Sequence, residues 1–338
     1  MKLCALLTAV GSLTIAMLYL SPAPANAFGP LRALLHRSHS DSSFDAESDG
    51  YGYFFNHLSC NKAVRAESRG SHRESTSIAP NYTASYGSSP LQTLDVYAPS
   101  KRENSSLPII VMVHGGAWCV GDKRMDKVVT HKAKRWVSKG FLFVSVDYRM
   151  LPQHADIMTQ AADVASAIAY VQAHAAQWGG NPAEVIVMGH SAGAHLVSLL
   201  NSDPQLAAQY GAHPWLGTIS LDSAALDVPM SMHAQHPVFY DDAFGSDPSV
   251  WLAASPFQHL SRRSLPWLGV CSSQRKDSCP HAHAYAKRAQ QLGVKASVLE
   301  EDMKHAEVND RLGEDPSYTD AVESFMASLS ADIAHHLK

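Results

Sequence analysis

A serine stands between two glycines at the point where a buried strand gives way to a helix. Residues 189–193 read Gly-His-Ser-Ala-Gly, after the apolar run 185–188 and before a helical segment over 192–200. Only small residues fit on either side of such a sharp turn, which lifts Ser191 clear of the sheet. The helix also points its N-terminal N–H groups at this spot. The context favours a strand–turn–helix unit that exposes a reactive serine over a chance match in a loop.

Strands alternate with helices on both sides of this junction. Ile157, Ala161, Val164 and Ile168 recur at spacings of three and four, which is typical of one face of a helix. Val322, Phe325, Leu329 and Ile333 predict a single final helix in the same way. Repeated strand–helix units imply an α/β fold with a mostly parallel sheet and helices on both faces. Further strands are expected at the apolar runs 109–113, 141–146, 216–221, 267–271 and 294–299.

The first 27 residues read as a secretory signal. Lys2 is their only charge, an apolar run covers 5–20, and small residues at Ala25 and Ala27 precede a cleavage point before Phe28. An uncleaved membrane anchor is the alternative, because a span of ~16 apolar residues is short but not impossible. We expect an exported protein, periplasmic or secreted, with no membrane association after cleavage.

The rest of the chain suits one large domain. About 310 residues remain after the leader, and apolar residues make up 46% of the 338, enough for a substantial core. The net charge of −4 gives no reason to expect nucleic acid as a partner. We divide this part into a preamble over 28–85, to which the sequence assigns no role, and a catalytic domain over 86–338.

A second glycine motif directly follows the strand at 109–113. Residues 114–118 read His-Gly-Gly-Ala-Trp. Acyl transfer builds negative charge on a carbonyl oxygen, and backbone N–H donors in a glycine loop can stabilise it. Taken alone, this motif would be read as an ordinary glycine turn. Because it precedes the serine turn in the same chain, we favour an oxyanion-binding loop instead.

A serine nucleophile needs a histidine base and an acid that orients it. His305 is the best candidate base, because it follows the strand at 294–299 across a short loop and should come after the acid in the chain. Asp277 follows the strand at 267–271, which is the strand immediately before 294–299 in the sequence. Asp227, after the strand at 216–221, is the alternative acid.

Four cysteines remain once Cys4 leaves with the leader. Cys271 ends a strand and Cys279 lies eight positions on, so the loop can return to the ~4.4–6.8 Å between Cα atoms that a disulfide needs. Export supplies the oxidising compartment. We predict this disulfide, which would hold Asp277 against His305. Nothing in the sequence shows whether Cys60 and Cys119 pair, and the spacings do not fit a metal site.

The chain resembles α/β-hydrolase carboxylesterases of the hormone-sensitive-lipase-like and kynurenine-formamidase-like branch. The resemblance covers roughly residues 86–335. It rests on the segments 94–99, 114–118, 147–149, 178–182, 189–193 and 253–256 and on the surroundings of His305. It implies a triad of Ser191, Asp277 and His305. It also implies an oxyanion hole formed by the N–H groups of Gly116, Ala117 and Ala192.

These observations predict a serine hydrolase that cleaves small carboxylic esters without a cofactor or metal. We expect short acyl chains, because Trp118 follows the oxyanion loop and no lid-like apolar insertion is evident. A formamidase or amidase that uses the same triad is one alternative. A catalytically silent binding protein of the same fold is another, and the intact serine, acid and histidine argue against it. The sequence leaves the oligomeric state open.

Overall fold

The computed structural model of this protein describes residues 59–68, 75–100 and 106–338. The predicted signal, residues 1–27, lies outside these ranges, as does part of the segment 28–85. In the described residues, eight strands form one sheet in the order β1-β2-β4-β3-β5-β6-β7-β8. The strands are β1 (Tyr82–Ser85), β2 (Thr93–Tyr97), β3 (Leu107–Val113), β4 (Leu142–Val146), β5 (Gly180–His190), β6 (Gly217–Leu221), β7 (Trp267–Ser272) and β8 (Ala296–Glu301).

The sheet is mostly parallel, as the sequence predicts. β4, β3, β5, β6, β7 and β8 pair in parallel, and β2 and β1 add an antiparallel edge. The sheet begins at Tyr82, four residues before the start that we drew for the catalytic domain. Strand β5 is longer than the apolar run at 185–188, because its first residues extend beside the start of β3.

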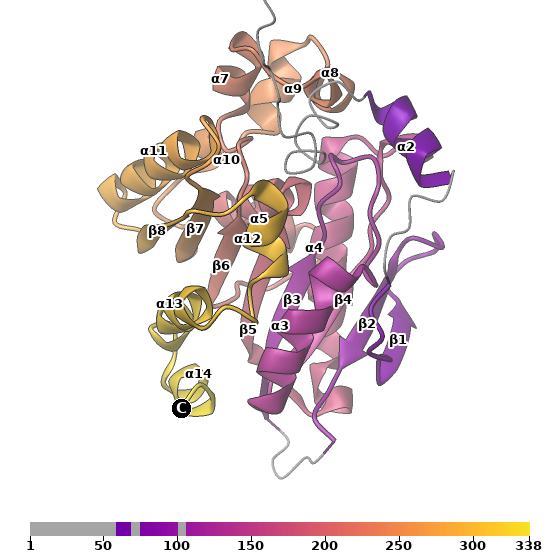
Figure 1. Ribbon diagram of the computed structural model, residues 1–338, viewed down its shortest axis with the longest axis vertical. Coiled ribbons are helices and arrows are strands. Elements are labelled where there is room, and N and C mark those ends of the chain that lie inside the picture. Colours follow the sequence, from indigo (N-terminus) through magenta and orange to yellow (C-terminus); the bar gives the residue numbers. More distant parts are fainter. Residues whose placement is uncertain (1–58, 69–74, 101–105) are drawn as a thin grey trace, which may run out of the picture. The chain divides into compact units, whose positions relative to one another are not determined.

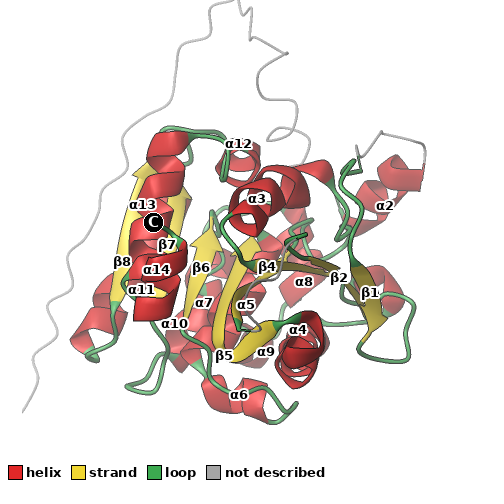
Figure 2. Ribbon diagram, turned by 90° about the horizontal axis from the view of Figure 1, so that it is seen from below, coloured by secondary structure: helices red, strands yellow, loops and turns green. Residues whose placement is uncertain are grey.

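Alternate residues of the central strands enter different cores. Val111 and Val113 of β3 pack on one face with α4 and α5, whereas Ile110 and Met112 pack on the other with α3 and α13. Both faces are therefore buried, which explains why these strands are continuous apolar runs. The helices that cover the two faces can be followed in Figure 2. They are α3 (Asp126–Ser138), α4 (Ile157–His174), α5 (Ala192–Ser202), α6 (Pro204–Ala208), α11 (Ser278–Gln291), α12 (His305–Asp310), α13 (Pro316–Ala327) and α14 (Ala331–His336).

The single final helix that the sequence predicts is two helices in the structure. α13 ends at Ala327, and Ser330 caps the N-terminus of α14 by accepting a hydrogen bond from the Ile333 N–H. A serine side chain can satisfy a free N–H group at a helix start, so Ser330 favours a new helix over continuation. Both helices still bury their apolar residues in the same core as Trp136, so the periodicity survives the break.

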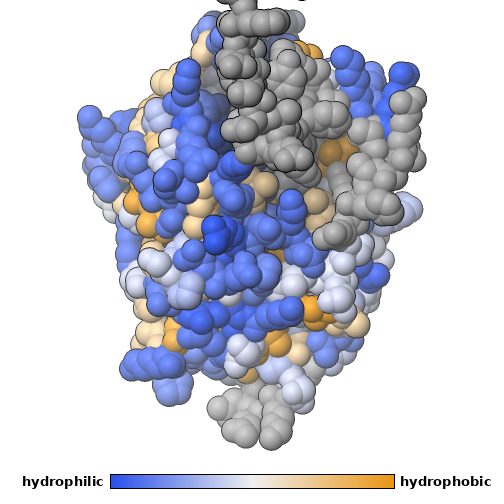
Figure 3. Space-filling model, in the orientation of Figure 1, coloured by the Kyte–Doolittle hydropathy of each residue, from blue (hydrophilic) through white to orange (hydrophobic). Residues whose placement is uncertain are grey.

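Four short helices form an insertion between β6 and β7 that we did not predict. They are α7 (Val228–His233), α8 (Val238–Phe244), α9 (Pro248–Ala253) and α10 (Pro256–His259). Figure 1 shows α7, α8 and α9 gathered beyond one end of the sheet. Large apolar side chains stay exposed on them, namely Met230, Val238, Val250 and Leu252. The expectation that the chain lacks an apolar insertion is therefore wrong. Elsewhere on the face in Figure 3, hydrophobic residues are scattered among hydrophilic ones.

A disulfide ties part of the segment 28–85 to the turn that follows β3. Cys60 begins α2 (Cys60–Ser68) and is bonded to Cys119, just after the His-Gly-Gly-Ala-Trp motif. The Cys60 N–H also donates to the Asp242 carboxylate of α8 at 2.6 Å. This pairing answers a question that the sequence left open. None of the helices in the described ranges is both long enough and apolar enough to span a bilayer.

Candidate active site

Ser191 occupies a strained turn between β5 and α5. Its φ of 55° and ψ of −116° lie outside the regions that non-glycine residues prefer. A Cβ atom at Gly189 would lie 2.5 Å from the Gly193 carbonyl oxygen, so a larger side chain could not replace that glycine without moving the turn. Such strain costs about 1–3 kcal/mol and persists only where the surroundings hold it. The predicted strand–turn–helix unit is therefore present around Ser191.

His305 begins α12 and lies within hydrogen-bond reach of Ser191. Its Nε2 atom is 3.0 Å from Ser191 Oγ, and its side chain is 30% exposed, so the pair can be reached from solvent. His190 supports it from β5, because its Nε2 donates to the His305 carbonyl at 3.0 Å. Burial, followed by the nearby His305 ring, lowers the pKa of His190 well below its usual value. His190 therefore acts as a neutral structural donor.

The carboxylate that contacts His305 belongs to Asp222. Its Oδ2 atom lies 2.5 Å from His305 Nδ1, and the residue is fully buried. Burial alone would raise the pKa of Asp222, but the hydrogen bond with His305 and the charge of Arg275 outweigh it, so this pKa lies well below its usual value. The Ser272 N–H and the Ser278 hydroxyl also donate to Asp222. The acid is therefore ionised and fixed in place.

Strand register explains why Asp222 meets the serine. His190 pairs with Leu221 across β5 and β6, so the next residues, Ser191 and Asp222, leave the sheet side by side. The Ser191 N–H donates to the Leu221 carbonyl at 2.9 Å, which locks this arrangement. A carboxylate directly after a strand end, at the position that the serine holds on the neighbouring strand, is the sequence signal that would have found it.

The prediction of Asp277 as the triad acid is wrong on geometry. Asp277 precedes α11, its side chain is 48% exposed, and its charged partner is Arg275 at 3.3 Å. The alternative Asp227 caps α7 by accepting from the Met230 N–H at 3.1 Å. Neither contacts His305 in any hydrogen bond of the described residues. Asp227 lies five residues beyond Asp222 in the same loop after β6, and Asp277 lies in the loop after β7, so adjacency in the sequence did not decide which carboxylate reaches the ring.

The glycine loop lies against Ser191. A Cβ atom at Gly115 would lie 2.9 Å from Ser191 Cβ. The next three residues, Gly116, Ala117 and Trp118, all have positive φ values, of 128°, 55° and 58°. This backbone closes a tight turn, because the Val120 N–H donates to the Gly116 carbonyl at 3.0 Å. The turn and the first residue of α5, Ala192, therefore both adjoin Ser191.

Aromatic rings surround the tryptophan that ends this turn. Trp118 is 2% exposed and packs against Phe239, Tyr240 and Phe244 of α8. Its indole N–H donates to His195 Nδ1 at 3.3 Å, while His195 Nε2 donates to the Ala254 carbonyl at 2.8 Å. Burial lowers the pKa of His195 to about 4, so this ring is neutral. The insertion thus packs directly onto the loop beside the serine.

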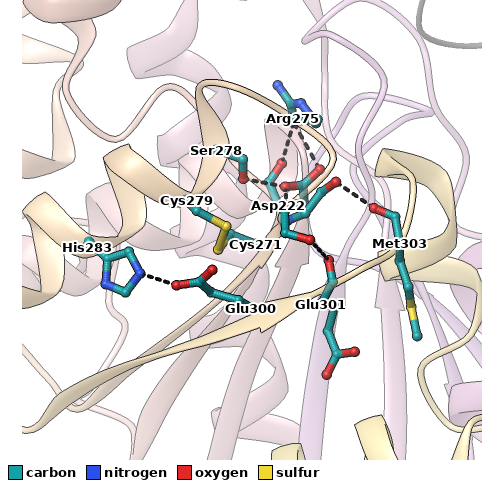
Figure 4. The surroundings of a disulfide bond; sticks show 11 residues. Asp222, Cys271, Arg275, Ser278, Cys279, His283, Glu300, Glu301 and Met303 are labelled. Carbon is teal, nitrogen blue, oxygen red and sulfur yellow. Dashed lines mark hydrogen bonds and ion pairs between the residues drawn. A yellow bond between two sulfur atoms is a disulfide. The ribbon is translucent and has the colours of Figure 1, made fainter.

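The loop after β7 is closed by a disulfide and surrounds Asp222. Cys271 and Cys279 are bonded, with 5.1 Å between their Cα atoms, and this is the pairing that the sequence favours. Figure 4 shows Arg275 and Ser278 on this loop, both directed at Asp222. The loop therefore serves a different carboxylate from the one that we expected. In the described part of the chain, no group of three or more His, Cys, Asp or Glu side chains could hold a metal ion.

Comparison of the fold with solved structures identifies its class. Esterase B from Lactobacillus Rhamnosis superposes with a TM-score of 0.62 at 20% identity, over 81% of this chain and 93% of that one. The protein has the α/β-hydrolase fold. The fold class that the sequence predicts is confirmed, because this neighbour and the mostly parallel sheet with its covering helices agree.

Sequence relatives of this protein include named esterases. Residues 94–212 match a family that is described as BD-FAE. Esterase LipC of Mycobacterium tuberculosis is 28% identical over 56% of this chain and 49% of its own length. A probable isoprenylcysteine α-carbonyl methylesterase of Arabidopsis thaliana is 34% identical over 33% of this chain and 23% of its own. The resemblance to esterases is confirmed, although the chain spans about half or less of these curated relatives.

Proposed function

We propose that this α/β-hydrolase is a serine esterase that cleaves small carboxylic esters through Ser191, His305 and Asp222. The contacts that carry this proposal are 3.0 Å between Ser191 Oγ and His305 Nε2 and 2.5 Å between His305 Nδ1 and Asp222 Oδ2. Nucleophile, base and acid thus stand in one line of hydrogen bonds. The esterase names of the relatives LipC and Esterase B support an ester as substrate.

The reaction follows from the proton positions that this line of contacts implies. Nδ1–H of His305 donates to the ionised Asp222, which leaves Nε2 as the acceptor for the Ser191 proton. Ser191 Oγ then attacks the acyl carbon, and His305 returns the proton to the leaving alcohol. Water releases the acid by the same route, with no cofactor. We assign the oxyanion hole to the N–H groups of Gly116, Ala117 and Ala192, which adjoin the serine.

A preference for short acyl chains is part of this proposal. The buried rings of Trp118 and Phe244 and the partly buried ring of Phe239 fill space directly beside the loop assigned to the oxyanion hole. Large side chains close to a reacting carbonyl leave less room for a long acyl chain. One solved structure of Esterase B holds a tributyrin phosphonate inhibitor with butyrate-length chains, which agrees with short acyl groups.

Export is also proposed, and the disulfides support it. Two bonds, Cys60–Cys119 and Cys271–Cys279, are present, and such bonds form and persist in oxidising compartments. We therefore propose that the chain acts in the periplasm or outside the cell, after removal of residues 1–27.

The Ser191→Ala variant tests the function. We expect kcat on p-nitrophenyl butyrate to fall about 10⁵- to 10⁶-fold, because the nucleophile is lost. We also expect a fluorophosphonate probe to label the wild type but not the variant. Ser324→Ala is the matched control, since that exposed serine only bonds within α13.

A labelled Ser191→Ala protein, or one with activity within tenfold of the wild type, would contradict the proposal. The acetate, butyrate and laurate esters test the chain length, and fastest turnover of laurate would exclude a short-chain enzyme. Faster cleavage of matched anilides than of esters would favour the amidase alternative.

A further inference from the structure

The loop after β7 brings a positive charge to the acid and imidazole of the triad. Arg275 Nη1 lies 3.0 Å from Asp222 Oδ2, 3.2 Å from the Asp222 carbonyl oxygen and 3.0 Å from His305 Nδ1. Figure 4 shows the guanidinium folded back over the Asp222 carboxylate. The proton transfer proposed above does not need this group. Its closeness to both residues therefore calls for a role of its own.

Hydrogen-bond accounting shows what Arg275 does at this position. His305 Nδ1 carries a proton and donates a hydrogen bond to Asp222. Nδ1 therefore has no lone pair left to accept a hydrogen bond from a guanidinium. The Nη1 hydrogens of Arg275 therefore go to the Asp222 carboxylate and carbonyl. Arg275 Nη1 and His305 Nδ1, which lie 3.0 Å apart, are then two donors side by side. When His305 takes up the serine proton, the positive charge of its imidazolium develops next to the positive charge of the Arg275 guanidinium.

Arg275 thus has two opposite effects on the base. It fixes the Asp222 carboxylate that orients His305, which favours the correct tautomer. Its charge also opposes a second positive charge on the His305 ring. The two effects can be separated, because holding Asp222 needs the two Nη1 hydrogens at their present positions, whereas opposing a charge on His305 needs only the positive charge.

Asp277 moderates this charge from the solvent side. Its carboxylate lies 3.3 Å from Arg275 Nη2, whereas Asp222 accepts from Nη1. At 48% exposure its field is screened by water, so its effect should be weaker than that of the buried Asp222. Asp277, which the sequence offered as the triad acid, is therefore the counter-ion of the arginine that contacts Asp222.

We propose that Arg275 is a positioning residue that holds the Asp222 carboxylate and, balanced by Asp277, opposes protonation of His305. This inference rests on the proposed esterase function and adds the residues that set its pH dependence. The charged and titratable groups that act on His305 and Arg275 are Asp222 after β6, His190 of β5, Tyr240 of α8, Asp277 before α11 and His281 of α11. Lys132 of α3 acts on His190, and Glu307 of α12 accepts from the Lys304 N–H beside His305.

The pH profile of kcat/KM tests this role. We expect Arg275→Gln to move the midpoint of the acid limb up by about one pH unit, because the imidazolium loses an opposing charge. Asp277→Asn should move it down by a few tenths of a unit, since the guanidinium loses its counter-ion. If Arg275 and Asp277 had a purely structural role, the two substitutions would not be expected to shift the midpoint in opposite directions.

Two further variants separate charge from geometry. Arg275→Lys keeps the charge, so the midpoint should lie within a few tenths of a unit of the wild type. We expect its kcat to be about tenfold below the wild type, because an ammonium cannot place its hydrogens where Nη1 of the planar guanidinium holds them. Lys276→Gln removes the exposed neighbouring cation and is the matched control, which should leave profile and kcat unchanged.

The rate of fluorophosphonate labelling against pH gives a second readout that needs no substrate. Unchanged midpoints in Arg275→Gln and Asp277→Asn, or shifts of the same sign, would overturn the proposal. If Arg275→Gln does not fold, the half-exposed Asp277→Asn still decides it. A wild type that is neither labelled nor active would instead refute the esterase function, so the two failures are distinct.

Discussion

Two carboxylates of this chain differ in what surrounds them, and the difference assigns their roles. Asp222 is fully buried, accepts from the Ser272 N–H at 2.9 Å and contacts His305 at 2.5 Å. Asp277 is half exposed and pairs with Arg275. An acid that orients an imidazole must be fixed and ionised, and only Asp222 has partners that secure both.

The Asp222→Asn and Asp277→Asn variants put this assignment to the test. Asparagine keeps the shape of Asp222 but presents the wrong donors, so we expect kcat to fall about 10⁴-fold while the protein stays folded. Asp277→Asn should keep kcat within about threefold at pH 8, where a small change in the acid limb has little effect. Steady-state hydrolysis of p-nitrophenyl butyrate measures both, and far-UV circular dichroism checks folding.

The reverse pattern, with Asp277→Asn inactive and Asp222→Asn active, would restore the assignment made from the sequence. That assignment failed for a physical reason. Ser191 and His305 could be placed from strand ends and short loops, because a local turn fixes each of them. The acid depends on which of several loop carboxylates reaches the ring, and that is decided by strand register and by the path of the loop over 272–278.

At the scale of elements, the loop between β7 and α11 is a preorganised support for Asp222. Ser272, Arg275 and Ser278 donate to this carboxylate within seven residues, and the Cys271–Cys279 disulfide closes the segment that carries them. Side chains locked by their own contacts hold a reacting group more precisely than a free loop does. The disulfide should therefore affect catalysis as well as stability.

A Cys271→Ser, Cys279→Ser double variant separates these two effects. We expect the free energy of unfolding to fall by ~2–3 kcal/mol, because a short cross-linked loop is lost from the unfolded chain. We also expect kcat to fall about tenfold, since the donors to Asp222 are held less firmly. Denaturant unfolding and ester hydrolysis measure the two changes. An unchanged kcat with reduced stability would mean that the remaining contacts suffice to hold the loop.

Elements differed in how well the sequence predicted them. β3, β5 and α4 follow from apolar runs and from 3-4 spacing, because each buries a whole face or both faces. The helices α7–α10 are only four to seven residues long, too short for a periodic pattern, and four of their large side chains remain exposed. α8 is stabilised by its contacts with Trp118, which no local pattern reveals.

At the scale of the whole molecule, a buried lysine joins α3 to α12, the helix that begins with His305. Lys132 of α3 is 1% exposed, and its ammonium donates to the carbonyls of Lys127 and Asn309. Asn309 lies near the end of α12, the helix that begins with His305. Lys132 therefore connects the helices on one face of the sheet to the element that carries the base.

Lys132 should make the stability of the fold depend on pH. Burial lowers the pKa of Lys132 from 10.5 to about 7, against the opposing fields of Asp310 and Asp126. Between pH 7 and 10.5 the unfolded chain binds this proton and the folded chain does not, so this group makes the free energy of unfolding rise with pH across that window. Below pH 7 both states hold the proton, and the cost of burying the charge is constant.

The Lys132→Met variant removes this titration while keeping most of the side-chain volume. We expect the wild type to gain stability relative to the variant as the pH rises from 7 to 10.5, by ~3–5 kcal/mol over the whole window. Denaturant unfolding at a series of pH values measures the difference, in which groups common to both proteins cancel. Lys134→Met, at an exposed position of the same helix, is the matched control. A difference that is flat with pH would show that the Lys132 ammonium keeps its proton in the fold, so that the two carbonyls compensate for its burial.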